Sequence, residues 1–201
     1  MLNPERVAAF HRDGFVLGDQ VLSDGEVEEL RQELDRVIDN YQDDTKPQPV
    51  RIANLGGDEQ APVWQIVNMW QASQPFRLLT HHPKIVAEVA QLLSAQELRV
   101  WHDQVQYKPS GTGGITGWHQ DSPAWPNIAP KTTQISSWVA LDDVDESNGC
   151  MSMVVGSHKW GVVRGVFPHG PHFDQMPDEF EGIKLEVRLC PVKKGYVHYH
   201  H

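Results

Sequence analysis

Residues 98–109 read LRVWHDQVQYKP, and residues 134–144 read QISSWVALDDV. Both stretches alternate large apolar side chains with polar ones, which is the pattern of a half-buried β-strand. Three shorter runs follow: CMSMVV at 150–155, LEVRL at 185–189 and GYVHYHH at 195–201. Clusters of Gly, Pro and Asn separate these runs. The second half of the chain therefore predicts an all-β sandwich or barrel with long loops.

The first half of the chain predicts mainly helices. Asn3 and Ser23 are good N-caps, and the residues after each of them keep the apolar spacing of a helix. We expect helices at 4–12, 24–41, 76–79 and 83–93, and short strands at 15–17 and near 50–52. The helices have little apolar surface to bury against except the sheet. The sequence therefore predicts one domain over 1–201, in which a helical part, 1–96, packs on the β part, 97–201.

Composition narrows the classes of partner. The chain has 201 residues with 17 Lys and Arg against 27 Asp and Glu, a net charge of −10, which argues against binding nucleic acid through a basic face. It has no apolar run long enough to span a membrane. Two cysteines, Cys150 and Cys190, are too few for a disulfide scaffold. We expect a soluble cytoplasmic protein that acts on a small molecule, and the sequence indicates no oligomeric state.

The motif that suggests chemistry is Trp118-His119-Gln120-Asp121. In an extended segment, side chains two residues apart point to the same face, so His119 and Asp121 could present a nitrogen and an oxygen to one point. These are two members of the 2-His-1-carboxylate triad of non-haem iron oxygenases. The spacing alone is weak support, because a surface His beside an Asp is common.

The order of motifs around WHQD is more specific. A β run ending in 104–109 precedes it, and an aromatic and proline loop, a strand carrying Trp138 and the segment SNGCMSMVVGSHKWG, 147–161, follow it. This order resembles the phytanoyl-CoA dioxygenase family of Fe(II)/2-oxoglutarate-dependent oxygenases. The opening HRDGFVLGDQVLSDGEVEELRQELD, 11–35, is also similar to that of the family. The resemblance covers nearly the whole chain.

The resemblance implies a double-stranded β-helix, or jelly roll, with helices packed on one side. It implies that His119 and Asp121 are the first two iron ligands, that Gln104 touches 2-oxoglutarate and that Trp138 lines the co-substrate pocket. An amide can hydrogen-bond a carboxylate, and an indole can wall a dry pocket. The alternatives are an outward-facing strand amide for Gln104 and a core position for Trp138.

Two other residues are candidates for the substrate pocket. Trp125, with its neighbour Pro126, follows the metal motif closely enough to line the substrate side, although packing of the loop is an equal alternative. Lys108 could reach an anionic substrate, although a solvated lysine at a strand end is the more ordinary interpretation.

The resemblance also implies a third iron ligand, a distal His in an HGS motif, and an Arg that pairs with 2-oxoglutarate. Neither motif occurs before His201, so we expect both beyond it and interpret the jelly roll as incomplete at its C-terminal end. His198 and His200 share one face of the last strand and could approach a metal, but a scaffold role is favoured. The activity of the chain as written stays open.

The leading functional hypothesis is a dioxygenase that uses Fe(II), 2-oxoglutarate and dioxygen. It would hydroxylate a small organic substrate at a C–H bond and convert 2-oxoglutarate to succinate and CO2. Two alternatives stay open: a non-catalytic jelly-roll protein that binds a small molecule or a metal, and a cupin-like iron enzyme that does not use 2-oxoglutarate. Nothing in the sequence selects the substrate.

Overall fold

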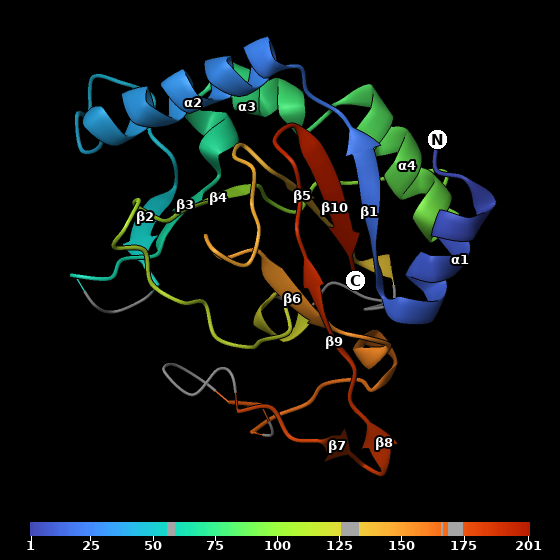
Figure 1. Cartoon of the computed structure of the whole chain (residues 1–201). Coiled ribbons are helices and arrows are strands. Elements are labelled where there is room, and N and C mark those ends of the chain that lie inside the picture. The colour runs from blue at the N-terminus through green and yellow to red at the C-terminus, as the bar shows by residue number, and fades with distance from the viewer. Residues whose placement is uncertain (56–58, 126–132, 166, 169–174) are drawn as a thin grey trace. The chain divides into compact units, whose positions relative to one another are not determined.

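A computed structural model describes residues 1–55, 59–125, 133–165, 167–168 and 175–201 (Figure 1). The chain divides into two compact units, each assembled from segments that are distant in sequence. The first unit contains Met1–Leu22, Lys84–Glu97 and Gly117–His201, and the second contains Ser23–Pro83 and Leu98–Thr116. The expectation of one domain over 1–201, in which a helical part, 1–96, packs on a β part, 97–201, stays a prediction.

The first unit is built around the last strand of the chain. Its elements are α1 (Pro4–Asp13), β1 (Phe15–Gln20), α4 (Pro83–Leu93), β5 (Ser136–Val139), β6 (Met151–Val154), β7 (Glu179–Phe180), β8 (Ile183–Lys184), β9 (Val187–Cys190) and β10 (Tyr196–His200). Strand β10 lies between β1 and β5, antiparallel to both (Figure 1). Val197 and Tyr199 in β10 are fully buried. The sheet β1-β10-β5 is therefore the core of this unit.

Helix α1 begins and ends as its sequence predicts. The side chain of Asn3 accepts a hydrogen bond from the backbone N–H of Arg6, and Pro4 occupies the first turn. Gly14 ends the helix with φ 91°, a left-handed conformation that favours glycine. Strand β1 starts at the next residue and extends to Gln20, three residues further than predicted.

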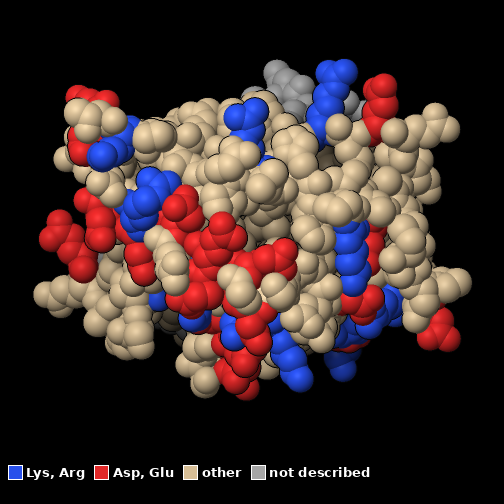
Figure 2. Space-filling view, turned by 90° about the horizontal axis from the view of Figure 1, so that it is seen from above, with Lys and Arg blue, Asp and Glu red and all other residues tan. Residues whose placement is uncertain are grey.

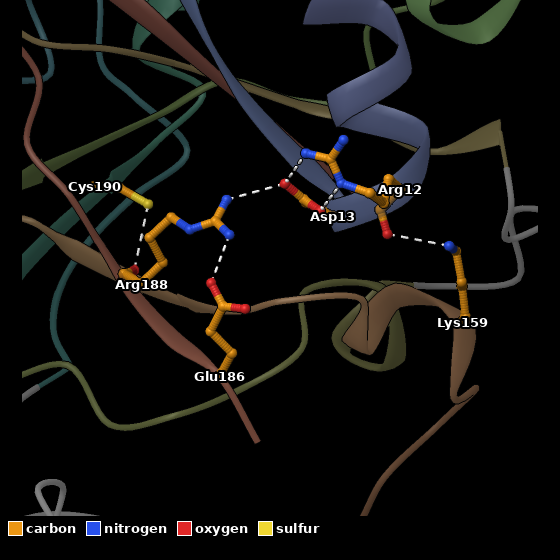
Figure 3. Close-up of polar contacts among 6 residues, drawn as sticks. All are labelled: Arg12, Asp13, Lys159, Glu186, Arg188 and Cys190. Carbon is orange, nitrogen blue, oxygen red and sulfur yellow. Dashed lines mark hydrogen bonds and ion pairs between the residues drawn. The ribbon is translucent and has the colours of Figure 1, made fainter. Parts of the chain in front are cut away.

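A buried carboxylate joins the end of α1 to β9 (Figure 3). The side chain of Asp13 is 4% exposed and accepts hydrogen bonds from Arg12 and from Arg188. Arg188 also pairs with Glu186, and Lys159 donates to the backbone carbonyl of Arg12. The carboxylate therefore connects segments from both ends of the chain.

The second unit combines two helices with one small sheet. Its elements are α2 (Asp24–Asp39), β2 (Arg51–Asn54), β3 (Trp64–Val67), a 3-10 helix (Met69–Gln71), α3 (Gln74–Leu79) and β4 (Gln104–Tyr107). Helix α2 starts at the N-cap predicted at Ser23, and Ser23 and Glu26 bond each other's backbone N–H in a capping box.

The sheet β2-β3-β4 is antiparallel, and its two faces differ in polarity. Ile52, Ile66 and Val105 lie opposite one another on one face, and Ile66 is fully buried. The other face carries polar side chains, including Arg51, Gln65 and Gln104. Burial of the apolar face therefore orients this sheet.

Several strands differ from the sequence prediction. The run 98–109 forms a strand only at Gln104–Tyr107. The Asp103 carboxylate, just before that strand, accepts from the backbone N–H of Trp70. Strand β3 and the short pair β7-β8 are additions that the sequence analysis did not predict. Four residues or fewer give too little alternation to detect.

The surface reflects the acidic composition. Figure 2 shows red acidic side chains gathered on the face turned to the viewer, with blue basic ones interspersed. Helix α2 alone carries seven Asp and Glu residues and two Arg residues. Among the described residues, no helix has the length and apolarity needed to cross a membrane.

Candidate metal centre

A nearby backbone carbonyl, two residues earlier in the chain, orients the His119 side chain. Its Nδ1 lies 2.8 Å from the carbonyl oxygen of Gly117, and that oxygen can only accept, so Nδ1 carries the proton. The other ring nitrogen, Nε2, lies 3.3 Å from Oδ1 of Asp121. A metal-binding histidine commonly donates its second N–H to a carbonyl in this way, because the bond selects the tautomer that has a lone pair for the metal.

Asp121 reaches His119 from a turn, which corrects the expectation of an extended segment. Its backbone is helical, with φ −66° and ψ −49°, and it precedes the 3-10 helix Ser122–Ala124. Pro123 in the first turn favours that helix. The two side chains therefore meet because the chain turns at Asp121, and not because they share the face of a strand.

The second carboxylate oxygen of Asp121 has two other partners from the central sheet. Ser136 Oγ donates to Oδ2 at 2.9 Å, and Nε2 of His200 lies 3.5 Å from the same atom. Ser136 and His200 face each other in β5 and β10. The sheet thus holds Oδ2, while Oδ1 faces His119.

The electrostatics of the cluster favour a carboxylate anion. Burial alone would raise the pKa of Asp121, but hydrogen bonds with His119, His200 and Ser136 outweigh it and hold that pKa well below its usual range. The hydrogen bond to Asp121 raises the pKa of His119, with burial opposing it. In the metal-free protein this bond needs a proton on Nε2 of His119, and a divalent cation that binds Nε2 and the Asp121 carboxylate would displace that proton.

The donor set fits iron in its chemistry but is incomplete. If His119 is neutral, its Nε2 and Oδ1 of Asp121 are two acceptors that face each other, an arrangement that a cation between them satisfies. Two imidazoles and one carboxylate are the ligand types of the facial triad. Within the described part of the chain, however, no group of three His, Cys, Asp or Glu side chains has the arrangement of a full metal site.

The histidines at the end of the chain have different surroundings. His198 is 2% exposed and stacks on Phe15, and burial lowers its pKa to about 3. His201 lies against Phe10 and His158. The scaffold role predicted for these residues agrees with both positions. The approach of His200 to Asp121 depends on the pairing of β10 with β5.

A cavity of about 260 Å³ adjoins His119. Gln120 helps to shape it, since its amide donates to the carbonyl of Gly161 at 2.9 Å and accepts from the N–H of Val163 at 2.8 Å. Among the described residues, its lining is Trp118, His119, Gln120, Val163, Arg164, Gly165 and Phe167. Neither the Gln120 contacts nor the place of Arg164 could be predicted from the sequence, because both depend on a segment about 40 residues further along the chain.

The other candidate residues fall in both units. Trp138 is half-buried in β5, two residues after Ser136, and lies opposite His198. Trp125 is half-buried directly after the 3-10 helix that follows Asp121, whereas its neighbour Pro126 lies outside the described residues.

Gln104 and Lys108 belong to the second unit. Gln104 is exposed at the start of β4, and Lys108 is half-buried just beyond the end of that strand. Burial lowers the pKa of the Lys108 ammonium, so this side chain is not the fully solvated lysine that the ordinary interpretation expects.

Comparisons with known proteins connect this geometry to a family. The sequence model described as Phytanoyl-CoA dioxygenase (PhyH) matches residues 10–201. The chain belongs to the phytanoyl-CoA dioxygenase family. This confirms the resemblance found in WHQD and in the segment 147–161.

Curated relatives of the family are larger than this chain. Ectoine dioxygenase of Halomonas elongata is 26% identical over 191 residues, which are 94% of this chain and 56% of the relative. Peroxisomal phytanoyl-CoA dioxygenase of Bos taurus is 25% identical over 169 residues, 79% of this chain and 48% of the relative. The chain spans about half the length of the curated relatives that it matches.

Solved structures confirm the predicted fold class. SnoK, a non-heme α-ketoglutarate-dependent carbocyclase from nogalamycin biosynthesis, has a TM-score of 0.78 and 26% identity over 100% of this chain and 74% of its own. The epimerase SnoN, in complex with Fe3+, α-ketoglutarate and nogalamycin RO, has a TM-score of 0.69 at 23% identity, over 98% of this chain and 73% of its own. These likenesses support the predicted fold class, a jelly roll with flanking helices.

Proposed function

We propose that the protein is a non-haem Fe(II)/2-oxoglutarate-dependent dioxygenase that hydroxylates a small organic substrate at a C–H bond. Family membership supports the enzyme class. The observation that carries the proposal to this chain is the carboxylate of Asp121, which lies between the Nε2 atoms of His119 and His200.

Each polar group around the carboxylate has a separate task in this proposal. His119 Nε2 and Asp121 Oδ1 face each other and hold the metal ion, and the Gly117 carbonyl keeps His119 in the required tautomer. Ser136 and His200 hold Oδ2 and so orient the carboxylate. Bound Fe(II) supplies the dioxygen chemistry, with 2-oxoglutarate as the source of electrons. The third ligand and the 2-oxoglutarate-binding Arg are still predicted beyond His201.

Gln104 and Trp138 are proposed contacts of 2-oxoglutarate. The exposed amide of Gln104 can donate two N–H groups to a carboxylate. Trp138 lies in β5 close in sequence to Ser136, which bonds Asp121, so its indole can shield the co-substrate from water.

The cavity beside His119 is the proposed substrate pocket. Its volume of about 260 Å³ suits a small molecule, and Trp118 and Phe167 supply apolar walls. Trp125 is not among the described residues that line this cavity and stays a separate proposed substrate contact, and Lys108 stays a proposed contact for an anionic group. We also keep the proposals that the protein acts in the cytoplasm and binds neither nucleic acid nor membranes, which rest on its composition.

Spectroscopy with matched variants tests the metal and co-substrate sites. Adding Fe(II) and then 2-oxoglutarate without oxygen to the protein expressed from its whole gene should give a weak visible charge-transfer band. His119→Ala should abolish the band, and His200→Ala should weaken metal binding about 10- to 100-fold without abolishing it, as expected of a residue that orients a ligand. His81→Ala, an exposed histidine of the second unit, is the control and should leave the band unchanged.

Three outcomes decide between the hypotheses. A band that survives both His119→Ala and Asp121→Ala would refute the metal assignment. Iron binding that 2-oxoglutarate does not perturb would favour the cupin-like enzyme that does not use this co-substrate. A protein that binds no iron would favour the non-catalytic jelly-roll protein. The gene sequence beyond His201 checks the predicted HGS motif directly.

A further inference from the structure

Three polar side chains form a hydrogen-bonded row across the sheet β2-β3-β4. Nη2 of Arg51 donates to Oε1 of Gln65 at 3.0 Å, and Nε2 of Gln65 donates to Oε1 of Gln104 at 2.8 Å. Arg51 and Gln104 both lie opposite Val67, and Gln65 precedes Val67 by two residues. All three side chains therefore share the polar face of the sheet.

The donors and acceptors along this row can be arranged in only one order. A guanidinium group has donors and no acceptor, so Gln65 must present its carbonyl oxygen to Arg51. The amide nitrogen of Gln65 then faces Gln104, which must receive it with its own carbonyl oxygen. The opposite orientation of either amide would place N–H groups against N–H groups. The arginine thus settles which end of each amide points where, a choice that is otherwise ambiguous in glutamine.

The consequence is that Gln104 presents its donors outward. Within the described part of the chain, Nε2 of Gln104 makes no hydrogen bond, and Arg51 has no carboxylate partner. A carboxylate is an acceptor only, so it matches the exposed N–H groups. Each bond in the row also polarises the next, which strengthens the terminal donor.

We propose that Arg51 and Gln65 are positioning residues that hold the amide of Gln104 with its N–H donors toward a carboxylate of 2-oxoglutarate. This inference rests on the proposed function, in which Gln104 is the co-substrate contact. Neither Arg51 nor Gln65 touches the co-substrate in this scheme. They act by preventing the Gln104 amide from turning its oxygen toward an anion.

Substitutions in the row should leave the fold intact, because the apolar side chains that stabilise this sheet are buried on its opposite face. Ile66 is fully buried on that face, whereas Arg51 and Gln104 are exposed. Changes in co-substrate binding can therefore be separated from unfolding, and a thermal melt of each variant verifies this.

The decisive variant is Gln65→Glu, which keeps the shape of the side chain. A carboxylate at this position still accepts from Arg51, but it also accepts from Gln104 and so turns the Gln104 oxygen outward. The dissociation constant of 2-oxoglutarate, measured from the charge-transfer band of the anaerobic Fe(II) protein, should rise about tenfold or more. Gln65→Met, which removes both bonds without adding charge, should raise it about threefold. Arg51→Lys, which keeps a charged donor, should stay within about twofold of the wild type.

Gln106→Glu is the matched control. Gln106 lies on the same face, directly opposite Gln65, and outside the hydrogen-bonded row. It receives the same change of charge, so a rise in the dissociation constant equal to that of Gln65→Glu would show a general charge effect and overturn the proposal. For Gln106→Glu, we expect the dissociation constant of 2-oxoglutarate to rise less than about threefold.

A second measurement needs no iron or co-substrate. In nitrogen-15 NMR spectra of the metal-free protein, Gln65→Glu should shift the side-chain N–H signals of Gln104, because they pass from solvent to a carboxylate. Unshifted signals would overturn the proposal. Gln104→Ala distinguishes the proposed contact of Gln104 with 2-oxoglutarate from the positioning role of Arg51 and Gln65. If this variant leaves 2-oxoglutarate binding unchanged, the contact fails and the positioning role fails with it. If Gln104→Ala weakens binding but both Gln65 variants do not, only the positioning role fails.

Discussion

At the scale of single residues, Asp103 shows how burial changes a carboxyl group. Its carboxylate accepts hydrogen bonds from the backbone N–H of Trp70, at 3.2 and 3.4 Å from the two oxygens. This N–H belongs to the 3-10 helix Met69–Gln71, which has no cap from its own N-cap side chain. Burial raises the pKa of Asp103 to about 6, and the bond from Trp70 opposes the increase.

Asp103 should therefore make stability depend on pH. Because its folded pKa is above its unfolded value of about 4, the native state binds more protons between these values, and the free energy of unfolding falls as pH rises from about 4 to 6. Asp103→Asn keeps an acceptor for Trp70 and has no charge to bury. At pH 7 the variant should be about 1–2 kcal/mol more stable than the wild type, after allowance for partial exposure. Urea unfolding at pH 4 and pH 7 measures this.

The stability difference between Asp103→Asn and the wild type, measured at pH 4 and at pH 7, checks whether the raised pKa of Asp103 is the cause. Near pH 4 the variant and the wild type should have similar stability. An equal gain at both values would contradict the assignment. Asp44→Asn, at an exposed position of the same unit, controls for the general loss of a negative charge.

At the scale of elements, Asp13 ties α1 to β9. Both Arg12 and Arg188 donate to its buried carboxylate (Figure 3). The hydrogen bond from Arg12 lowers the pKa of Asp13, burial opposes it, and Arg188 lowers it further. Since the folded pKa is depressed, the stability that this group contributes is present above about pH 4 and is lost as pH falls through the lower folded pKa.

Removing the charge of Asp13 should loosen this junction. Asp13→Asn has one acceptor oxygen instead of two and turns its amide N–H groups toward arginine donors. We expect the free energy of unfolding at pH 7 to fall by about 1–3 kcal/mol, measured by urea denaturation. Glu186→Gln, which removes the exposed partner of Arg188, should change it by less than about 0.5 kcal/mol. Equal effects of the two substitutions would contradict the special role of the buried carboxylate.

The elements that the sequence predicted well are those with strong local signals. Asn3, Pro4 and Gly14 mark both ends of α1, and Ser23 with Glu26 marks the start of α2. Strand β3 was missed because four residues, WQIV, pair with strands on both sides only in the folded sheet. Local chemistry thus predicts helix ends, whereas pairing of short strands is a property of the sheet.

At the scale of the whole molecule, metal binding should couple to folding. The proposed ligands His119 and Asp121 are both in the first unit, close together in sequence, and the sheet β1-β10-β5 orients Asp121 through Ser136 and His200. A metal ion that binds only the folded state stabilises it by about 2.7 kcal/mol at 100 times its dissociation constant.

Nickel(II) is a convenient probe of the coupling between metal binding and folding, because this ion is stable toward dioxygen in water. At about 100 times its dissociation constant it should raise the thermal midpoint by about 5–10 °C. His119→Ala should lose this shift, while His81→Ala should keep it, and differential scanning calorimetry measures both. An equal shift in both variants would place the metal elsewhere on the protein.

The sequence by itself determined the family and marked the starts of α1 and α2, and it is the basis on which His119 and Asp121 are proposed as ligands. WHQD, the segment 147–161 and the caps at Asn3 and Ser23 carry this information in neighbouring residues, where side-chain chemistry acts over a few ångströms of chain. Only the tertiary structure decided that Asp121 bends out of the extended form, that His200 and Ser136 hold its second oxygen and that Arg51 aligns Gln65 and Gln104. Apart from the bend at Asp121, these contacts join residues 14 to 79 positions apart. The pairing of strands brings them together, and no local pattern encodes the register of that pairing.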